Sequence, residues 1–144
     1  MPQTVLKVKL LRERARLPTR ATPGSSGLDL YACLEAPVDL TQDVTLVPTG
    51  IAMEAPTGYD IQVRPRSGLA RQGVDIIFGT IDCDYRGEIF VNMRTFGSTQ
   101  TFRIEHGDRI AQLVIARVVD LPVVEVQDLT ESERGAGGYG STGR

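Results

Sequence analysis

Two carboxylates, an aromatic ring and an arginine lie close together in residues 79–87, Gly-Thr-Ile-Asp-Cys-Asp-Tyr-Arg-Gly. Asp82 and Asp84 are typical turn-forming residues, which is a strong explanation by itself. A carboxylate held near a phosphate can also accept a proton from an attacking water molecule. The segment is therefore either a plain turn or a turn that carries a catalytic base.

Three other segments combine charge, hydroxyl or amide groups in ways that a plain β-sandwich does not require. In residues 65–70, the Ser67-Gly68 pair offers a hydroxyl and backbone N–H groups, and Arg66 can fork onto phosphate oxygens. A serine N-cap beside a surface arginine explains the same residues equally well. Gln112 lies inside an apolar strand pattern, so it must find a structural partner or a ligand. Asp29, in an alternating strand pattern, is most simply a solvent-facing carboxylate.

The last eleven residues, 134–144, differ in kind from the rest of the chain. They hold five of its fifteen glycines and only one large apolar residue, Tyr139. Such a segment cannot bury enough surface to order itself, and an unstructured terminus is the simplest interpretation. Glycine-rich backbone can also close on phosphate, with hydroxyls from Ser141 and Thr142 and a base-stacking ring from Tyr139.

Composition narrows the class of protein. The chain has 144 residues, enough for one domain, and a formal net charge of −2, which argues against non-specific nucleic-acid binding. No apolar run approaches the ~20 residues of a membrane span, and the N-terminus lacks the apolar region of a signal peptide. Two cysteines and one histidine make neither a disulfide framework nor a Cys/His zinc site. We expect a cytoplasmic protein with no membrane partner.

Glycine and proline punctuate short apolar stretches, which predicts an all-β sandwich or barrel. Residues 82–87 are the expected turn of a hairpin, and both faces of the strand near Leu113 are apolar, so we expect cover on both sides. The only expected helical turn is 67–71. The expected strands are 27–40, 43–55 with a kink at 48–50, 59–64, the hairpin arms 75–81 and 88–96, 101–104 and 109–119.

Each of these signals is weak alone, but together the segments closely resemble the five ordered motifs of the trimeric deoxyuridine triphosphate nucleotidohydrolases (dUTPases). The matching segments are 21–32, 64–69, 79–87, 107–113 and 134–143, and the resemblance runs from about residue 16 to the C-terminus. It implies a single-domain, jelly-roll-like β core over 1–133 and a flexible arm over 134–144 that closes over a neighbouring subunit's site. It also implies a homotrimer with three active sites, each built from parts of three subunits.

The resemblance implies hydrolysis of dUTP to dUMP and pyrophosphate, by in-line attack of water on the α-phosphorus. This reaction limits uracil incorporation into DNA and supplies dUMP for dTMP synthesis. Asp82 matches the family's general base. Mg²⁺ enters on the triphosphate as the cofactor, and Asp29 acts on it only through water.

The resemblance also assigns the substrate contacts. Tyr85 packs on deoxyribose, the hairpin backbone pairs with uracil, and Tyr139 stacks on the base. Ile76 stands where many bacterial members have an asparagine that contacts uracil, so that amide contact is missing here. The implied binding residues are Arg66, Ser67, Gly68, Gly79, Thr80, Ile81, Asp82, Tyr85, Phe90, Gln112, Arg134, Gly138, Tyr139, Gly140, Ser141 and Thr142.

Two other functions fit the same pattern less well. A dUTP-binding regulator would keep the site without catalysing, but Asp82 and the whole arm are present. A dCTP deaminase shares the architecture, but it needs a different acid/base set and generally lacks the glycine-rich arm.

Overall fold

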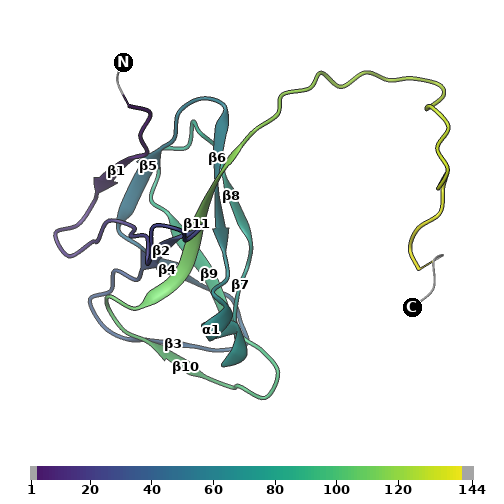
Figure 1. Cartoon of the computed structure of the whole chain (residues 1–144). Helices are drawn as coiled ribbons and strands as arrows, with labels where there is room; N and C mark the ends of the chain where they lie inside the picture. Colours follow the sequence, from purple (N-terminus) through teal and green to yellow (C-terminus); the bar gives the residue numbers. More distant parts are fainter. Residues whose placement is uncertain (1–2, 141–144) are drawn as a thin grey trace.

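The computed structural model describes residues 3–140 as a β-sandwich with one helical turn (Figure 1). The elements are β1 (Lys7–Leu10), β2 (Leu28–Tyr31), β3 (Val38–Leu40), β4 (Thr45–Pro48), β5 (Ile51–Glu54), β6 (Tyr59–Arg64), α1 (Ser67–Arg71), β7 (Val74–Ile76), β8 (Gly79–Ile81), β9 (Phe90–Thr95), β10 (Phe102–Ile104) and β11 (Arg109–Arg117).

Two antiparallel sheets supply most of the core. The larger has the strand order β2-β11-β6-β8 and the smaller β4-β9-β7, while β1-β5 and β10-β3 form two-stranded ribbons. The strands alternate as a half-buried sheet requires: in β6, Ile61 and Val63 are buried and Gln62 between them is not. This arrangement confirms the expected all-β class.

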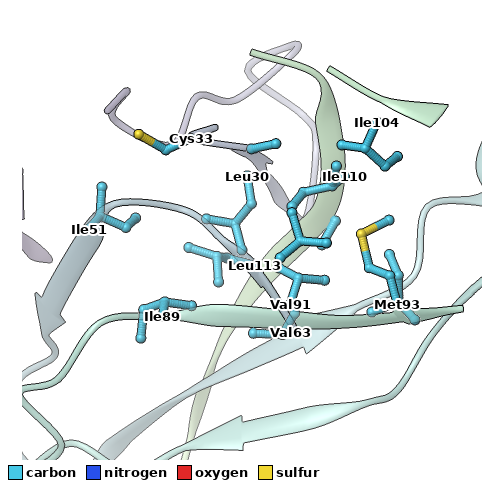
Figure 2. Packing of buried hydrophobic residues seen from close by; sticks show 14 of the residues in the cluster. Leu30, Cys33, Ile51, Val63, Ile89, Val91, Met93, Ile104, Ile110 and Leu113 are labelled. Carbon is cyan, nitrogen blue, oxygen red and sulfur yellow. The ribbon is translucent and has the colours of Figure 1, made fainter. Parts of the chain in front are cut away.

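The core lies between the two sheets (Figure 2). Leu30 and Leu113 come from the larger sheet and meet Val91 and Met93 of the smaller, all at most 1% exposed. Cys33 is buried at the edge of this cluster, where it acts as a small apolar residue, whereas Cys83 is only half-buried.

Several local expectations are confirmed. β6 and α1 have the predicted bounds, and the strand over 43–55 is interrupted as predicted, between β4 and β5. Gly50 makes that kink with a φ of +70°, and a side chain there would also lie 2.9 Å from the Cβ of Ala15. Glycine is required at this position on both grounds.

Three expectations are corrected. The strand predicted over 27–40 stops at Tyr31, because the next backbone groups bond to other loops: the Ala32 N–H donates to the Asp108 carbonyl at 2.8 Å. The arm predicted over 75–81 is two strands: β7 pairs with β9, but β8 pairs with β6. The ribbon strand β1 was not predicted, because its residues are mostly exposed and show no buried face.

The C-terminal part of the chain departs from the body. After β11 the described residues form no strand or helix up to residue 140, and Figure 1 shows them arching away from the sandwich. Leu113 is fully buried, but its neighbours Val114 and Ile115 are only half-buried in one copy. The expected cover on both faces of β11 is therefore incomplete within a single chain.

Among residues 3–140, no helix has the length and apolar character needed to cross a membrane.

Candidate active site

A pocket of about 260 Å³ opens where the two arms of the predicted hairpin separate. The Ile77 N–H still donates to the Asn92 carbonyl at 2.9 Å; beyond this point β8 joins β6, and β9 joins β4. The fork brings together six residues that the sequence singled out: Gly79, Thr80, Ile81, Asp82, Tyr85 and Phe90. The remaining lining residues are Val63, Ile77, Glu88, Ile89 and Asn92.

A tight turn presents the Asp82 carboxylate. The Tyr85 N–H donates to the Asp82 carbonyl at 3.1 Å, and the Asp82 residue is exposed. Arg86 stabilises the turn from outside, donating to the Cys83 carbonyl at 2.6 Å and to Glu54 at 2.8 Å. The turn is thus held by hydrogen bonds of its own, and its Asp82 carboxylate is accessible to water.

Phosphate-binding chemistry gathers at the ends of β2, β6 and β11. The Asp29 carboxylate is 3.5 Å from Arg66 and 3.8 Å from Arg109, and Arg66 donates to the Arg109 carbonyl at 3.0 Å. Only 13% of the Asp29 side chain is exposed, so the simple solvent-facing interpretation of this residue is wrong. Two guanidinium groups around one carboxylate leave a net positive charge, which suits a polyanion.

Arg109 was not singled out from the sequence, because it follows the ordinary turn residues Gly107 and Asp108. Pairing between β11 and β2 places Arg109 opposite Tyr31 and Gln112 opposite Asp29. The only sequence feature that could have pointed to Arg109 was its position as a basic residue at the start of the strand that carries Gln112.

Within one chain the Gln112 side chain has a backbone hydrogen-bond partner, whereas the Ser67 side chain does not cap the helix. Gln112 Nε2 donates to the Pro65 carbonyl at 2.8 Å, and Gly27 packs so closely that an added Cβ would lie 2.4 Å from Gln112 Oε1. A structural hydrogen bond therefore explains one of its N–H groups, and the other can serve a ligand. Ser67 is not the N-cap: Arg66 occupies that position, and Ser67 is exposed as the first residue of α1, followed by Gly68.

Asp82 and the basic cluster lie toward opposite ends of β6. Ile81 pairs with Ile61, so Asp82 continues toward the start of β6, whereas Gln112 pairs with Arg64 at its end. Asp82 therefore lies opposite position 60, six residues from Arg66, which is about 20 Å at the rise of a β-strand. One copy does not bring Asp82 and Arg66 to the same phosphate.

The C-terminal arm is also remote from both places. Arg134 donates to the carbonyl of Gly137, next to Gly138, and Tyr139 is fully exposed with a φ of +49°. Gly140 follows with a φ of +88°. Ser141 and Thr142 lie outside the described residues.

The donor groups fit a metal ion that arrives on a ligand. Within residues 3–140 there is no group of three or more His, Cys, Asp or Glu side chains arranged to hold a metal. Asp29 is already flanked by two arginines, so water-mediated contact to Mg²⁺ suits it better than direct ligation.

Comparison with known proteins decides the family. The dUTPase family model matches residues 13–143. This chain belongs to the dUTPase family. Among curated relatives, the deoxyuridine 5'-triphosphate nucleotidohydrolase of Desulfotalea psychrophila is 50% identical over 135 residues, covering 91% of this chain and 89% of the relative. That of Hydrogenobaculum sp. is also 50% identical, covering 96% and 97%.

Solved dUTPase structures share the fold. The dUTPase of Staphylococcus bacteriophage 80alpha, with dUpNHpp, has a TM-score of 0.87 at 29% identity and covers 99% of this chain and 100% of that one. A variant of the phage phi11 dUTPase, described with a structural Mg(II) ion, has a TM-score of 0.77 at 26% identity, covering 86% and 97%. The likeness to dUTPases confirms the jelly-roll-like β fold.

Ile76, which stands where many bacterial members of the family have an asparagine, does not reach the pocket. Ile76 is 3% exposed and belongs to the core rather than to the pocket of this dUTPase. Asn92, on β9, lines the pocket instead and pairs with Leu46 of β4. It lies on the same outward face as Phe90, because Val91 between them is buried. Sequence reasoning missed Asn92, because no local pattern distinguishes an amide on an outward strand face.

Proposed function

We propose that three copies of this chain assemble and hydrolyse dUTP to dUMP and pyrophosphate at sites shared between copies. Membership of the dUTPase family makes dUTP the substrate. The shared site rests on one observation: Asp82 lies about 20 Å along β6 from Arg66, farther than one α-phosphate can bridge. We divide the chain into a core, residues 1–133, and an exchanged arm, residues 134–144.

Exposed apolar residues between the core and the arm support the assembly. Val119, Leu121, Val123, Val124 and Leu129 are each at least 73% exposed. An extended stretch with this much apolar surface is stabilised when a second copy covers it. The half-buried outer face of β11 is a second apolar surface available for such a contact.

Asp82 acts as general base in this proposal. It accepts a proton from the water that attacks the α-phosphorus, while pyrophosphate leaves on the opposite side. Arg66, Ser67, Gly68, Gln112 and the neighbouring Arg109 bind the phosphates of the same substrate from another copy. Positioning and charge neutralisation supply most of the rate, because an ordinary aspartate is a weak base.

Asp29 would hold a Mg²⁺ ion brought in on the triphosphate, through water, and the bound ion would supply charge neutralisation. The arm of a third copy adds Arg134, Gly138, Gly140, Ser141 and Thr142 around the phosphates. Its Tyr139 ring stacks on uracil and closes the site against solvent.

The pocket gives the nucleotide specificity. Backbone N–H and carbonyl groups of Gly79–Ile81 and Phe90 pair with the uracil edge, so cytosine would leave a fixed donor or acceptor unpaired. The thymine methyl group would clash in the narrow space between β8 and β9.

The formal net charge of −2 gives no basis for nucleic-acid binding, and the two free cysteines fit a reducing, cytoplasmic compartment.

Tyr85→Ala is expected to weaken sugar selection. The ring leaves no space for a 2′-hydroxyl, so its removal admits UTP, and we expect the dUTP-to-UTP ratio of kcat/KM to fall at least about tenfold. Steady-state pyrophosphate release on both nucleotides measures this ratio. An unaltered ratio would place sugar selection elsewhere.

Asn92→Val is expected to raise KM for dUTP about fivefold to tenfold, the loss of roughly one hydrogen bond in a desolvated pocket. A carboxamide can rotate to serve either uracil or cytosine, so the dUTP-to-dCTP ratio should hold. An unchanged KM would remove Asn92 from the base contacts.

Pyrophosphate release across dUTP, dCTP, dTTP and UTP, with and without Mg²⁺, tests the function as a whole. Release from dUTP alone, strengthened by Mg²⁺, is the expected result. Comparable release from the other nucleotides would overturn the specificity, and ammonia release from dCTP would show a deaminase.

A further inference from the structure

We propose that Arg12 and Glu88 are a positioning pair that fixes the Tyr85 ring and thereby sets the discrimination between dUTP and UTP. This inference rests on the proposed function and adds two residues that act through Tyr85. Arg12 precedes the segment matched by the family model, which begins at residue 13.

The Tyr85 ring is held at two points. Its hydroxyl donates to the Glu88 carbonyl at 3.0 Å. Its ring lies against Gly87, where an added Cβ would come within 2.5 Å of the Tyr85 hydroxyl oxygen and 2.7 Å of Cζ. The position of the ring therefore depends on where the backbone of Gly87 and Glu88 lies.

Arg12 fixes that backbone through the Glu88 side chain. Its two terminal nitrogens donate to the two carboxylate oxygens, Nη1 to Oε1 at 2.8 Å and Nη2 to Oε2 at 2.5 Å. The exposed fraction is 14% for the Glu88 side chain and 41% for the Arg12 side chain, so the carboxylate is largely shielded and the guanidinium is partly open to solvent. The hydrogen bond to Glu88 is the main reason why the pKa of Arg12 is raised.

A second set of bonds ties both residues to the β4–β5 kink. The Gly50 N–H approaches Glu88 Oε2 at 3.4 Å, and the Leu11 N–H donates to the Gly50 carbonyl at 2.7 Å. The Ile89 N–H donates to the Ile51 carbonyl at 2.9 Å. These bonds hold the Ile89 end of the segment to the sandwich, and Arg12 adds the contact that fixes the Glu88 side chain beside the kink.

Loss of Arg12 leaves the Glu88 carboxylate little exposed and without its cation. The carboxylate then turns toward solvent and gives up its contact with the Gly50 N–H. The Gly87 and Glu88 backbone that carries the Tyr85 ring is then held to the sandwich only at its Ile89 end, and the ring loses its fixed position. A displaced ring admits the 2′-hydroxyl of UTP but leaves Asp82 in place. The effect should fall on sugar selection more than on turnover of dUTP.

The test measures kcat/KM for dUTP and UTP in four variants of the full chain. We expect Arg12→Ala and Glu88→Gln to lower the dUTP-to-UTP ratio about tenfold, with kcat of Arg12→Ala on dUTP within about twofold of wild type. Arg12→Lys should give an intermediate ratio, since lysine cannot make the two-pronged contact. The charge-exchanged double variant Arg12→Glu/Glu88→Arg should recover part of the ratio.

Arg103→Ala is the matched control, because Arg103 pairs with Asp39 at 3.1 Å on the β3–β10 ribbon, outside the pocket. It removes an arginine from an exposed ion pair and should leave the ratio unchanged. The inference fails if Arg12→Ala changes the dUTP-to-UTP ratio no more than Arg103→Ala does. If Arg12→Ala does not fold, the same criterion applies to Arg12→Lys. If Tyr85→Ala also leaves the ratio unchanged, the sugar filter of the proposed function fails instead.

Discussion

We expect Asp82→Asn to lower kcat for dUTP by about 10³-fold, within the range that a general base contributes. Asparagine has nearly the same shape, so it keeps the turn and the pocket, but it cannot accept the proton of the attacking water. Binding of a non-hydrolysable dUTP analogue, measured by calorimetry, should change little. A large loss of kcat with retained affinity is the signature of a group that acts in the transition state.

Asp84→Asn is the control for this variant. Asp84 is two residues away in the same exposed turn, but it does not line the pocket. Its substitution should leave kcat near the wild-type value. Near-normal turnover in Asp82→Asn, or an equal loss in Asp84→Asn, would remove Asp82 from the role of base.

We expect removal of residues 134–144 to lower kcat/KM for dUTP about 10²-fold or more, because the lid and its phosphate contacts are lost together. The apolar stretch that precedes the arm remains, so the proposed trimer should persist. Light scattering would measure the mass, and pyrophosphate release the rate. Unchanged rates would show that the arm is only a terminus.

Tyr139→Ala separates the ring from the rest of the arm. It removes stacking on uracil but keeps Arg134 and the glycines, so it should lose less activity than the truncation. Dissociation of the truncated chain into monomers would instead assign the arm to assembly.

The local sequence pattern was sufficient to predict the strands and helices whose bounds depend on residues nearby in the sequence. β6 and α1 have the predicted bounds, since Pro65 ends the strand and Ser67-Gly68 begins the turn. The pocket was largely predictable as well, because most of its lining comes from one continuous hairpin sequence.

Pairing across the fold was not predictable. Nothing near Gly79 shows that β8 leaves its hairpin partner for β6, and that choice opens the fork in which the pocket lies. Arg109 and Arg12 were missed for the same reason: each forms an ion pair with a carboxylate distant in sequence, Asp29 and Glu88 respectively.

A site that takes Asp82 from one copy and the arm from another can be tested with mixed trimers. Asp82→Asn and the 134–144 deletion, each inactive alone, are co-expressed with different tags, and trimers that carry both tags are isolated. Every mixed trimer then has one site in three with both Asp82 and an arm, so about one third of wild-type activity should return. Mixed trimers as inactive as their parents would contradict a site shared between copies.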